Sequence, residues 1–116
     1  MASAVDRVRS YDPFILKAAE KYNVPVNLVR AAMLQESGGN PVARSEQQAM
    51  GLMQVIPATW ERMGGGDPDD PETNIDRGVK YLGMQLEEFG TPEAALAAYH
   101  QGEGTTRLTR GKPAGP

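Results

Sequence analysis

Apolar residues recur at helical spacing in the first third of the chain, in two stretches separated by a proline. The first stretch predicts a helix over residues 12–23, with Asp12 as its N-cap and a proline in its first turn. It should end before Pro25, because proline disfavours helical geometry in the preceding residue. The second stretch predicts a helix over residues 25–37, which a Gly-Gly-Asn-Pro segment terminates.

The rest of the chain predicts shorter helices joined by loops, and no segment shows the alternation typical of a strand. A third long helix should start with Asn74 as its N-cap. We therefore expect a mainly α domain with little or no β structure. The expected segments are a polar lead-in over 1–10, a loop over 42–56, a short helix over 57–63, a glycine- and proline-rich loop over 64–71, helices over 74–89 and 91–99, and a flexible tail or truncated C-terminal part over 103–116.

Composition narrows the possible functions of this chain. Its 116 residues suit one domain, and a net charge of −3 argues against a nucleic-acid partner. The absence of cysteine excludes thiolate metal sites, and a single histidine argues against a histidine-based one, so we expect neither metal nor cofactor. No apolar run has the length of a membrane span and the N-terminus lacks a signal-peptide pattern, so we expect no membrane insertion.

Glu36 is the first candidate for chemistry. Val29 and Met33 precede it at helical spacing, so the apolar face of the helix should turn Glu36 inward. An apolar setting at the negative end of a helix should raise the pKa of a carboxyl group, and cleavage of a glycosidic bond needs such a protonated acid. The alternative is an ordinary solvated glutamate. Many glycosidases use two carboxylates, but no partner is compelling among Glu46, Glu61, Asp67, Asp69 and Asp70.

Three other side chains leave alternatives open. Tyr99 can be a core residue or can present its hydroxyl to a cleft. For His100, a surface position at a helix end is the preferred interpretation over a catalytic one. Trp60 and most of the methionines are interpreted as core residues.

Four segments in order resemble the soluble lytic transglycosylase (SLT) family, which has a lysozyme-like fold with a substrate cleft. They match the family patterns ES-x-x-NP, GLMQ, P-x-x-NI-x-x-G-x-x-YL and A-AYN-x-G. Together they indicate a domain over residues 11–102. In this sequence they are the segments beginning at Glu36, Gly51, Pro71 and Ala97.

The resemblance implies that Glu36 is the sole catalytic acid and base. It would protonate the glycosidic oxygen between N-acetylmuramic acid and N-acetylglucosamine in peptidoglycan, and then deprotonate the muramoyl 6-hydroxyl to close a 1,6-anhydro ring. The N-acetyl group of the substrate would replace a second carboxylate. The implied partner is the glycan strand, at the bacterial cell wall, reached in the periplasm, from outside the cell or by phage delivery.

The resemblance also assigns substrate-binding roles to residues of the matched segments. Ser45 would hydrogen-bond the N-acetyl group, Gly51 would let backbone approach the sugar, and Met53 would line the cleft. Gln54 would bond the sugar or the acid, and Tyr99 would place its hydroxyl near the acid and the muramoyl ring.

Further residues have supporting roles, and two depart from the family pattern. His100 stands where the family usually has asparagine, and as a substrate-binding residue it could make activity pH-sensitive near neutrality. Gln48 stands where the family usually has glycine, so the loop around it could be shaped differently. The supporting residues are Ser37 at the helix end, Asn40, Ile56 on an apolar wall, and Asn74.

Two other functions remain open at this stage. A muramidase similar to goose-type lysozyme would share Glu36 but add water. A degenerate wall-binding or structural domain of a phage tail or secretion apparatus would have no activity. In either case we expect a monomer or part of a larger polypeptide.

Overall fold

The computed structural model describes residues 2–101, which contain six helices and no strand. The mainly α prediction is therefore confirmed. Two isolated antiparallel bridges, from Met50 to Arg44 and to Val55, are the β pairing found in this part of the chain. The helices are α1 (Ala4–Arg9), α2 (Asp12–Tyr22), α3 (Val26–Glu36), α4 (Pro57–Met63), α5 (Pro71–Phe89) and α6 (Pro92–Gln101).

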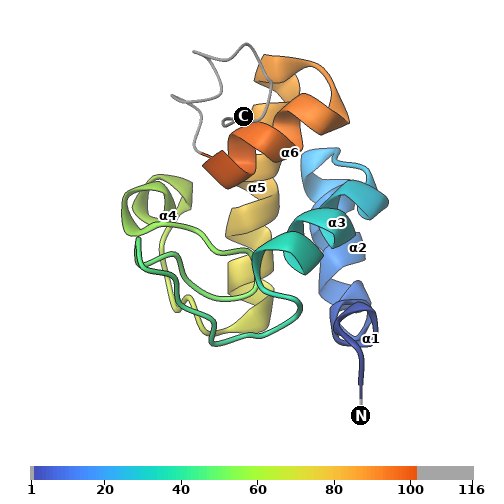
Figure 1. The fold of residues 1–116 in the computed structure, drawn as a ribbon. Helices are drawn as coiled ribbons and strands as arrows, with labels where there is room; N and C mark the ends of the chain where they lie inside the picture. Colours follow the sequence, from blue (N-terminus) through green and yellow to red (C-terminus); the bar gives the residue numbers. More distant parts are fainter. Residues whose placement is uncertain (1, 102–116) are drawn as a thin grey trace, which may run out of the picture.

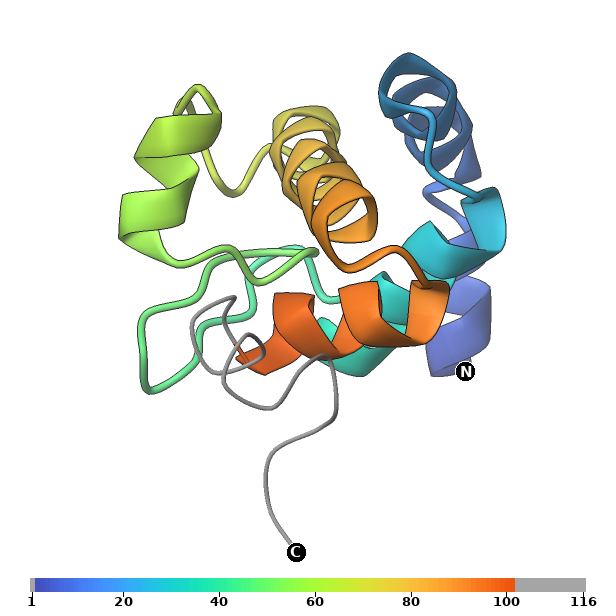
Figure 2. The same cartoon turned by 90° about the horizontal axis from the view of Figure 1, so that it is seen from above.

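The longest helix, α5, forms the centre of the domain. It lies between α2 and α4, and α6 crosses near its C-terminal end (Figures 1 and 2). Its buried face carries Ile75, Val79 and Leu82, which pack with Ile15 of α2 and Met33 of α3 in one core. No helix within residues 2–101 has the length and apolar character needed to cross a membrane.

The first ten residues, for which the sequence predicts only a polar lead-in, contain a helix. Ser3 caps α1 by accepting a hydrogen bond from the backbone of Asp6, and the side chain of Asp6 accepts from the backbone of Ser3. Val8 is buried in the common core. A capping box and one buried apolar residue are sufficient to fix this single turn and a half against the domain.

Helix α1 packs against the turn that follows α3. The guanidinium of Arg7 donates from Nε to the carbonyl of Gly38 at 3.1 Å. A Cβ added to Gly39 would lie 2.6 Å from the Cβ of Arg7, so only glycine permits this close approach. The N-terminal helix thus supports the end of the helix that carries Glu36.

Two predicted N-caps are also wrong. Asp12 is the first residue of α2, where it forms an ion pair of 2.8 Å with Arg30 instead of a cap. The N-cap of α5 is Asp70, which accepts a hydrogen bond from the backbone of Thr73. Asn74 lies inside the first turn of α5, where its side chain is fully buried and bonds to a neighbouring loop.

The other helix limits agree closely with the prediction. Helix α2 ends at Tyr22, where Asn23 takes a left-handed conformation, and α5 ends at Phe89 before a left-handed Gly90. The short helix α4 has the predicted bounds, and Trp60 on it is a core residue. Helix α6 runs to Gln101, two residues further than predicted. The prediction of a flexible tail over 103–116 lies outside the described residues.

Candidate active site

A cleft of about 580 Å³ opens between the end of α3, the loop over 45–56 and the end of α6. It contains six of the predicted site residues, and Glu36 is the only carboxylate among its described lining residues. The lining consists of Gln35, Glu36, Ser45, Gln47, Ala49, Gln54, Val55, Ile56, Thr59, Tyr81, Tyr99, His100 and Gln101.

Glu36 is the last residue of α3, and its side chain is only 10% exposed. The helix turns it toward the cleft because Val29, Ala32 and Met33 on the same face are buried in the core. Burial raises the pKa of the Glu36 carboxyl, and contact with His100 lowers it by a smaller amount. The predicted direction is therefore confirmed, with burial as the cause. Such a carboxyl group can hold a proton at higher pH than a solvated glutamate.

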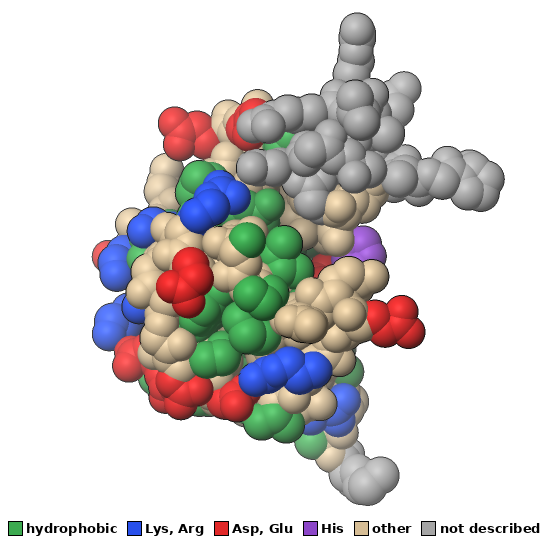
Figure 3. Space-filling model, turned by 90° about the vertical axis from the view of Figure 1, so that its left-hand side faces the viewer, with side chains coloured by type: hydrophobic (Ala, Val, Ile, Leu, Met, Phe, Trp, Pro, Cys, Tyr) green, Lys and Arg blue, Asp and Glu red, His purple; other side chains and the backbone are tan. Residues whose placement is uncertain are grey.

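His100 is in direct contact with Glu36, which the sequence did not indicate. Its Nδ1 lies 2.8 Å from Glu36 Oε2, although the two residues are 64 positions apart. The imidazole is 51% exposed, so one edge faces the acid while the rest meets solvent; Figure 3 shows the histidine in purple at the surface. The preferred interpretation as a surface histidine at a helix end was therefore incomplete.

Tyr99 meets both interpretations that the sequence left open. It is 7% exposed and belongs to the core, yet it also lines the cleft. Its hydroxyl donates to the backbone carbonyl of Met53 at 2.6 Å, and its ring lies 5.4 Å from that of Tyr81. Burial, followed by the charge of Glu36 and then Tyr81, raises the pKa of Tyr99 well above its usual value. Its hydroxyl therefore remains protonated and remains a donor.

Two predicted polar residues of the cleft also shape its loop. Ser45 accepts a hydrogen bond from the backbone of Ala49 through its hydroxyl oxygen. The amide nitrogen of Gln54 donates to the carbonyls of Ala43 and Gly51 at 3.0 and 2.9 Å. Because both amide protons hold the loop, a contact between Gln54 and a sugar would use its Oε1 as an acceptor.

Gly51 and Met53 are not among the described residues that line the cleft. Met53 is fully buried, so its side chain does not line the cleft; it packs against Gly78, where an added Cβ would lie 2.5 Å from Met53 Cγ. Gly51 has a φ of 72°, and a Cβ there would lie 2.6 Å from the carbonyl oxygen of Pro68. Packing within the protein alone therefore requires glycine at this position.

Asn74 fastens this loop to α5. Its Oδ1 accepts from the backbone of Met53 at 2.8 Å, and its Nδ2 donates to the carbonyls of Met50 and Pro68 at 3.0 and 2.8 Å. The side chain therefore bonds three backbone groups on two segments. It supports the wall of the cleft from inside the core, and these three hydrogen bonds are what its predicted supporting role consists of.

The remaining predicted residues lie around the same site. Ser37 accepts from the backbone of Gly39 and donates to the carbonyl of Met33, so it supports the end of α3 as expected. Asn40 is exposed and bonds the backbone of the following turn. Ile56 is 45% exposed and lines the cleft.

Gln48, which stands where the family pattern has glycine, takes a backbone conformation that favours glycine. It has a φ of 65°, a left-handed conformation that glycine adopts without cost. Its backbone donates to the carbonyl of Ser45 at 2.9 Å and closes a turn. The backbone conformation that suits glycine is therefore present, and glutamine occupies it.

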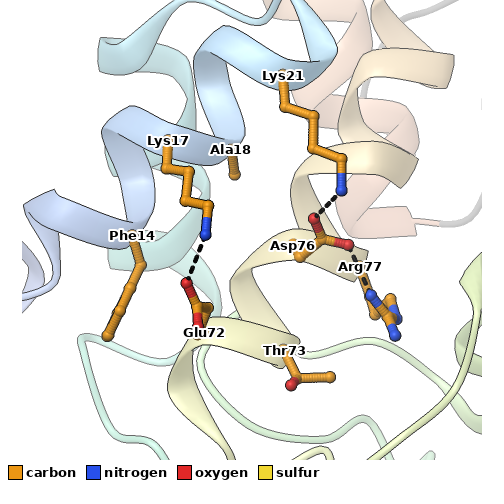
Figure 4. A pocket seen from close by; sticks show the side chains of 8 residues that line it. All are labelled: Phe14, Lys17, Ala18, Lys21, Glu72, Thr73, Asp76 and Arg77. Carbon is orange, nitrogen blue, oxygen red and sulfur yellow. Dashed lines mark hydrogen bonds and ion pairs between the residues drawn. The ribbon is translucent and has the colours of Figure 1, made fainter.

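A second hollow of about 200 Å³ lies between α2 and α5 and shares no lining residue with the cleft (Figure 4). Asp76 is its central group. Burial raises the pKa of Asp76, but hydrogen bonds from Lys21, Arg77 and Tyr22 outweigh burial and lower it. A further ion pair joins α2 to Glu72. These contacts pair both carboxylates of the hollow with cations and join the two helices, so we assign this hollow no chemistry.

The helical fold and the largely buried Glu36, the one carboxylate among the described lining residues of the cleft, define a lysozyme-like domain. Comparison with known families identifies the family of this domain. Residues 13–114 match the Transglycosylase SLT domain, and the chain belongs to this family. The four segments that resemble the family therefore identified it correctly.

Individual relatives support this assignment. The transglycosylase of Enterobacteria phage PRD1 is 41% identical over 85 residues, covering 73% of this chain and 32% of the relative. The membrane-bound lytic murein transglycosylase C of Haemophilus influenzae (strain PittEE) is 38% identical over 117 residues, covering 84% and 33% respectively. The chain thus spans about a third of the length of these curated relatives.

Solved structures show the same fold. The 70-kDa soluble lytic transglycosylase of Escherichia coli has a TM-score of 0.76 at 31% identity, covering 87% of this chain and 18% of that one. An inactive glutamate-to-glutamine mutant of the lytic transglycosylase Slt from Pseudomonas aeruginosa has a TM-score of 0.73 at 27% identity, covering 83% and 17%.

Proposed function

We propose that this domain is a peptidoglycan lytic transglycosylase, which cleaves the bond from N-acetylmuramic acid to N-acetylglucosamine and leaves a 1,6-anhydro end. The observation that carries the proposal is Glu36, the one carboxylate among the described residues of the cleft, largely buried and with a raised pKa. Relatives named lytic murein transglycosylase and phage transglycosylase support it. The site of action is then the bacterial cell wall.

In the first step Glu36 acts as the acid. Its proton passes to the glycosidic oxygen as the bond from that oxygen to the muramoyl C1 breaks, and the N-acetylglucosamine side leaves as an alcohol. A buried carboxyl group is suited to this step because burial keeps it protonated. The positive charge that develops at C1 is met by the carbonyl oxygen of the substrate's own N-acetyl group, so no second carboxylate is needed.

In the second step the Glu36 carboxylate acts as the base. It takes the proton of the muramoyl 6-hydroxyl while that oxygen bonds to C1, the N-acetyl oxygen leaves C1, and the 1,6-anhydro ring closes. No water is consumed, and Glu36 ends in its initial protonated state. A hydroxyl tethered within the same sugar has a high effective molarity, on the order of 10⁵ M or more in favourable cases, so it can compete with water.

The neutral polar groups of the cleft suit an N-acetylated glycan. We assign Ser45 to the N-acetyl group, Gln54 Oε1 to a sugar hydroxyl and Ile56 to the apolar face of a ring. Tyr99 acts mainly through the loop, because its hydroxyl is already bonded to Met53. Hydroxyl and amide groups of this kind fix sugar orientation through hydrogen bonds.

Digestion of purified peptidoglycan, with mass measurement of the released muropeptides, tests the proposal. We expect products one water lighter than those of a muramidase, and Glu36→Gln should reduce the rate by at least about 10³-fold, since the acid is removed without a change in shape. Glu46→Gln, which changes a carboxylate outside the cleft lining, is the matched control and should keep the activity. Hydrated products would instead indicate the muramidase, and the absence of products would indicate a wall-binding or structural domain.

A further inference from the structure

His100 is the residue of the cleft that the family pattern does not explain. It stands where the family usually has asparagine, and it lines the cleft and contacts the acid. The contact uses Nδ1, which lies 2.8 Å from Glu36 Oε2. Two acceptor atoms cannot share this distance without a proton between them, so the pair is joined by a hydrogen bond.

The two oxygens of the Glu36 carboxyl group have different surroundings, and this difference gives them different roles. Oε2 is bound to His100, while the side chain as a whole is held at the wall of the cleft by the last turn of α3. Oε1 has no hydrogen bond to a described residue. A carboxyl group with one oxygen fixed by a donor presents the other oxygen to a ligand in a defined orientation.

We propose that His100 is a positioning residue for Glu36: its Nδ1–H donates to Oε2, so that Oε1 carries the proton that is transferred to and from the substrate. This inference rests on the proposed function of Glu36. When the proton leaves Oε1, the hydrogen bond at Oε2 strengthens because its acceptor becomes charged. When Oε1 takes the proton of the 6-hydroxyl, the same bond weakens again. His100 itself neither gains nor loses a proton in either step.

The position of Nδ1 in the side chain decides which substitutions at residue 100 keep a donor in its place. In both side chains a nitrogen is bonded to Cγ, so His100 Nδ1 and the amide nitrogen of an asparagine lie the same number of bonds from the backbone. The amide nitrogen of glutamine is one bond further, where it corresponds to Nε2. Substitution by asparagine, glutamine and alanine therefore separates a donor at the Nδ1 position from one at the Nε2 position.

Among the described residues that line the cleft, few other groups can change the charge near this pair. Tyr99 on α6 and Tyr81 on α5 are the other titratable residues of the described cleft lining, and the pKa of Tyr99 is raised well above its usual value. The loop contributes serine, alanine, valine, isoleucine and glutamine to the lining. Since the contact with His100 lowers the pKa of Glu36, its removal should let Glu36 keep its proton to higher pH.

The test measures kcat, KM and the pH profile of kcat/KM on peptidoglycan for His100→Ala, His100→Asn and His100→Gln. We expect kcat to fall about tenfold in the alanine and glutamine variants, the size of one partly exposed hydrogen bond to a charged group, with KM nearly unchanged. His100→Asn should stay within roughly threefold of the natural protein. The pH at which activity is lost on the alkaline side should move upward, most in His100→Ala and less in His100→Asn, which keeps a neutral donor.

Thermal unfolding of each variant shows whether a loss of activity comes from loss of structure. A merely structural role of His100 would lower the melting temperature of His100→Ala and leave the alkaline limb in place, and this result would overturn the inference. Equal loss in the asparagine and alanine variants would also overturn it. If Glu36→Gln is inactive while His100→Ala behaves as the natural protein, the positioning role of His100 is refuted and the proposed function stands. If Glu36→Gln is active, both the proposed function of Glu36 and the positioning role of His100 are refuted.

Discussion

One buried side chain, Asn74, bonds the loop that forms one wall of the cleft to α5, and Asn74→Ala should show how much this contributes. Asn74 is fully buried and makes three hydrogen bonds to backbone groups of Met50, Met53 and Pro68. Alanine would leave one N–H and two carbonyls without these partners. The loss affects two loop segments at once, because the same amide bonds both.

The magnitude follows from the number of bonds lost. A buried hydrogen bond contributes about 1 kcal/mol net, and a buried group left without a partner costs about 1–3 kcal/mol. Entry of water into the space vacated by Asn74 would recover part of this cost. We therefore expect a loss of about 3–5 kcal/mol, a large share of the roughly 5–15 kcal/mol typical of a domain.

Urea unfolding followed by tryptophan fluorescence measures this change, because Trp60 is buried and donates to the carbonyl of Gly66, in the loop segment that also carries Pro68. With a slope of about 2 kcal/mol per M, the midpoint should fall by about 2 M. Asn40→Ala is the matched control: Asn40 is exposed and accepts one hydrogen bond from its own turn, so its removal should cost less than about 1 kcal/mol.

Peptidoglycan cleavage by folded Asn74→Ala should also fall, because the segment it releases carries Gln54 and the carbonyl that Tyr99 bonds. A midpoint within about 0.5 M of the natural protein would refute the reasoning, since it would mean that the three bonds contribute less than a single exposed one. A loss of stability without any effect on cleavage would refute its second part, that Asn74 maintains the wall of the cleft.

Three further predictions concern stability. Gly78→Ala should destabilise by about 2 kcal/mol despite the better helix propensity of alanine, because its Cβ would overlap the buried side chain of Met53. Gly83→Ala is the control: its Cβ would lie 3.2 Å from a methyl group of Val24, a milder contact, so it should cost less by urea unfolding. Asp76→Asn should lower the free energy of unfolding by about 1 kcal/mol at neutral pH, and this loss should disappear as pH falls through the lowered pKa of Asp76. Glu72→Gln, in an exposed ion pair, is the control; an equal loss in both variants would contradict a special role of Asp76 in joining the helices. Glu36→Gln should raise the melting temperature at neutral pH, because a carboxyl group with a raised pKa destabilises the folded state when it is ionised. The gain in melting temperature should fade near pH 4, where the carboxyl group is protonated in both states; an equal gain at both pH values would exclude ionisation as its source.

Local signals account for the helices that the sequence predicts well. The bounds of α4 and the ends of α2 and α5 follow from proline, asparagine and glycine placed beside apolar repeats. Helix α1 was missed because six residues with one buried side chain show no periodicity. The pair Ser3 and Asp6, spaced as a capping box, was the available signal. The misplaced N-cap at Asn74 has a similar origin, because an asparagine before an apolar repeat suits a cap and a buried clamp equally.

The features of the site that could be predicted also depend on local sequence, and those that could not depend on contacts between helices. The inward direction of Glu36 depends on its own helix, so spacing was enough to predict it. The contact with His100 depends on how α6 crosses α3, which no local pattern encodes. Burial of Met53 likewise depends on Gly78, a residue of another helix. Sequence patterns therefore predict which residues belong to the site better than they predict what those residues touch.

The contact between α1 and the turn after Glu36 has a consequence for how this chain can vary. Gly39 is constrained twice, once by its own φ of 84° and once by Arg7 on a helix that precedes the part of the chain matching the family. A relative without such a helix would keep only the first constraint, which asparagine can meet. Substitutions at position 39 and changes in the N-terminal helix should therefore be interdependent, so that a side chain harmless in one background is harmful in the other.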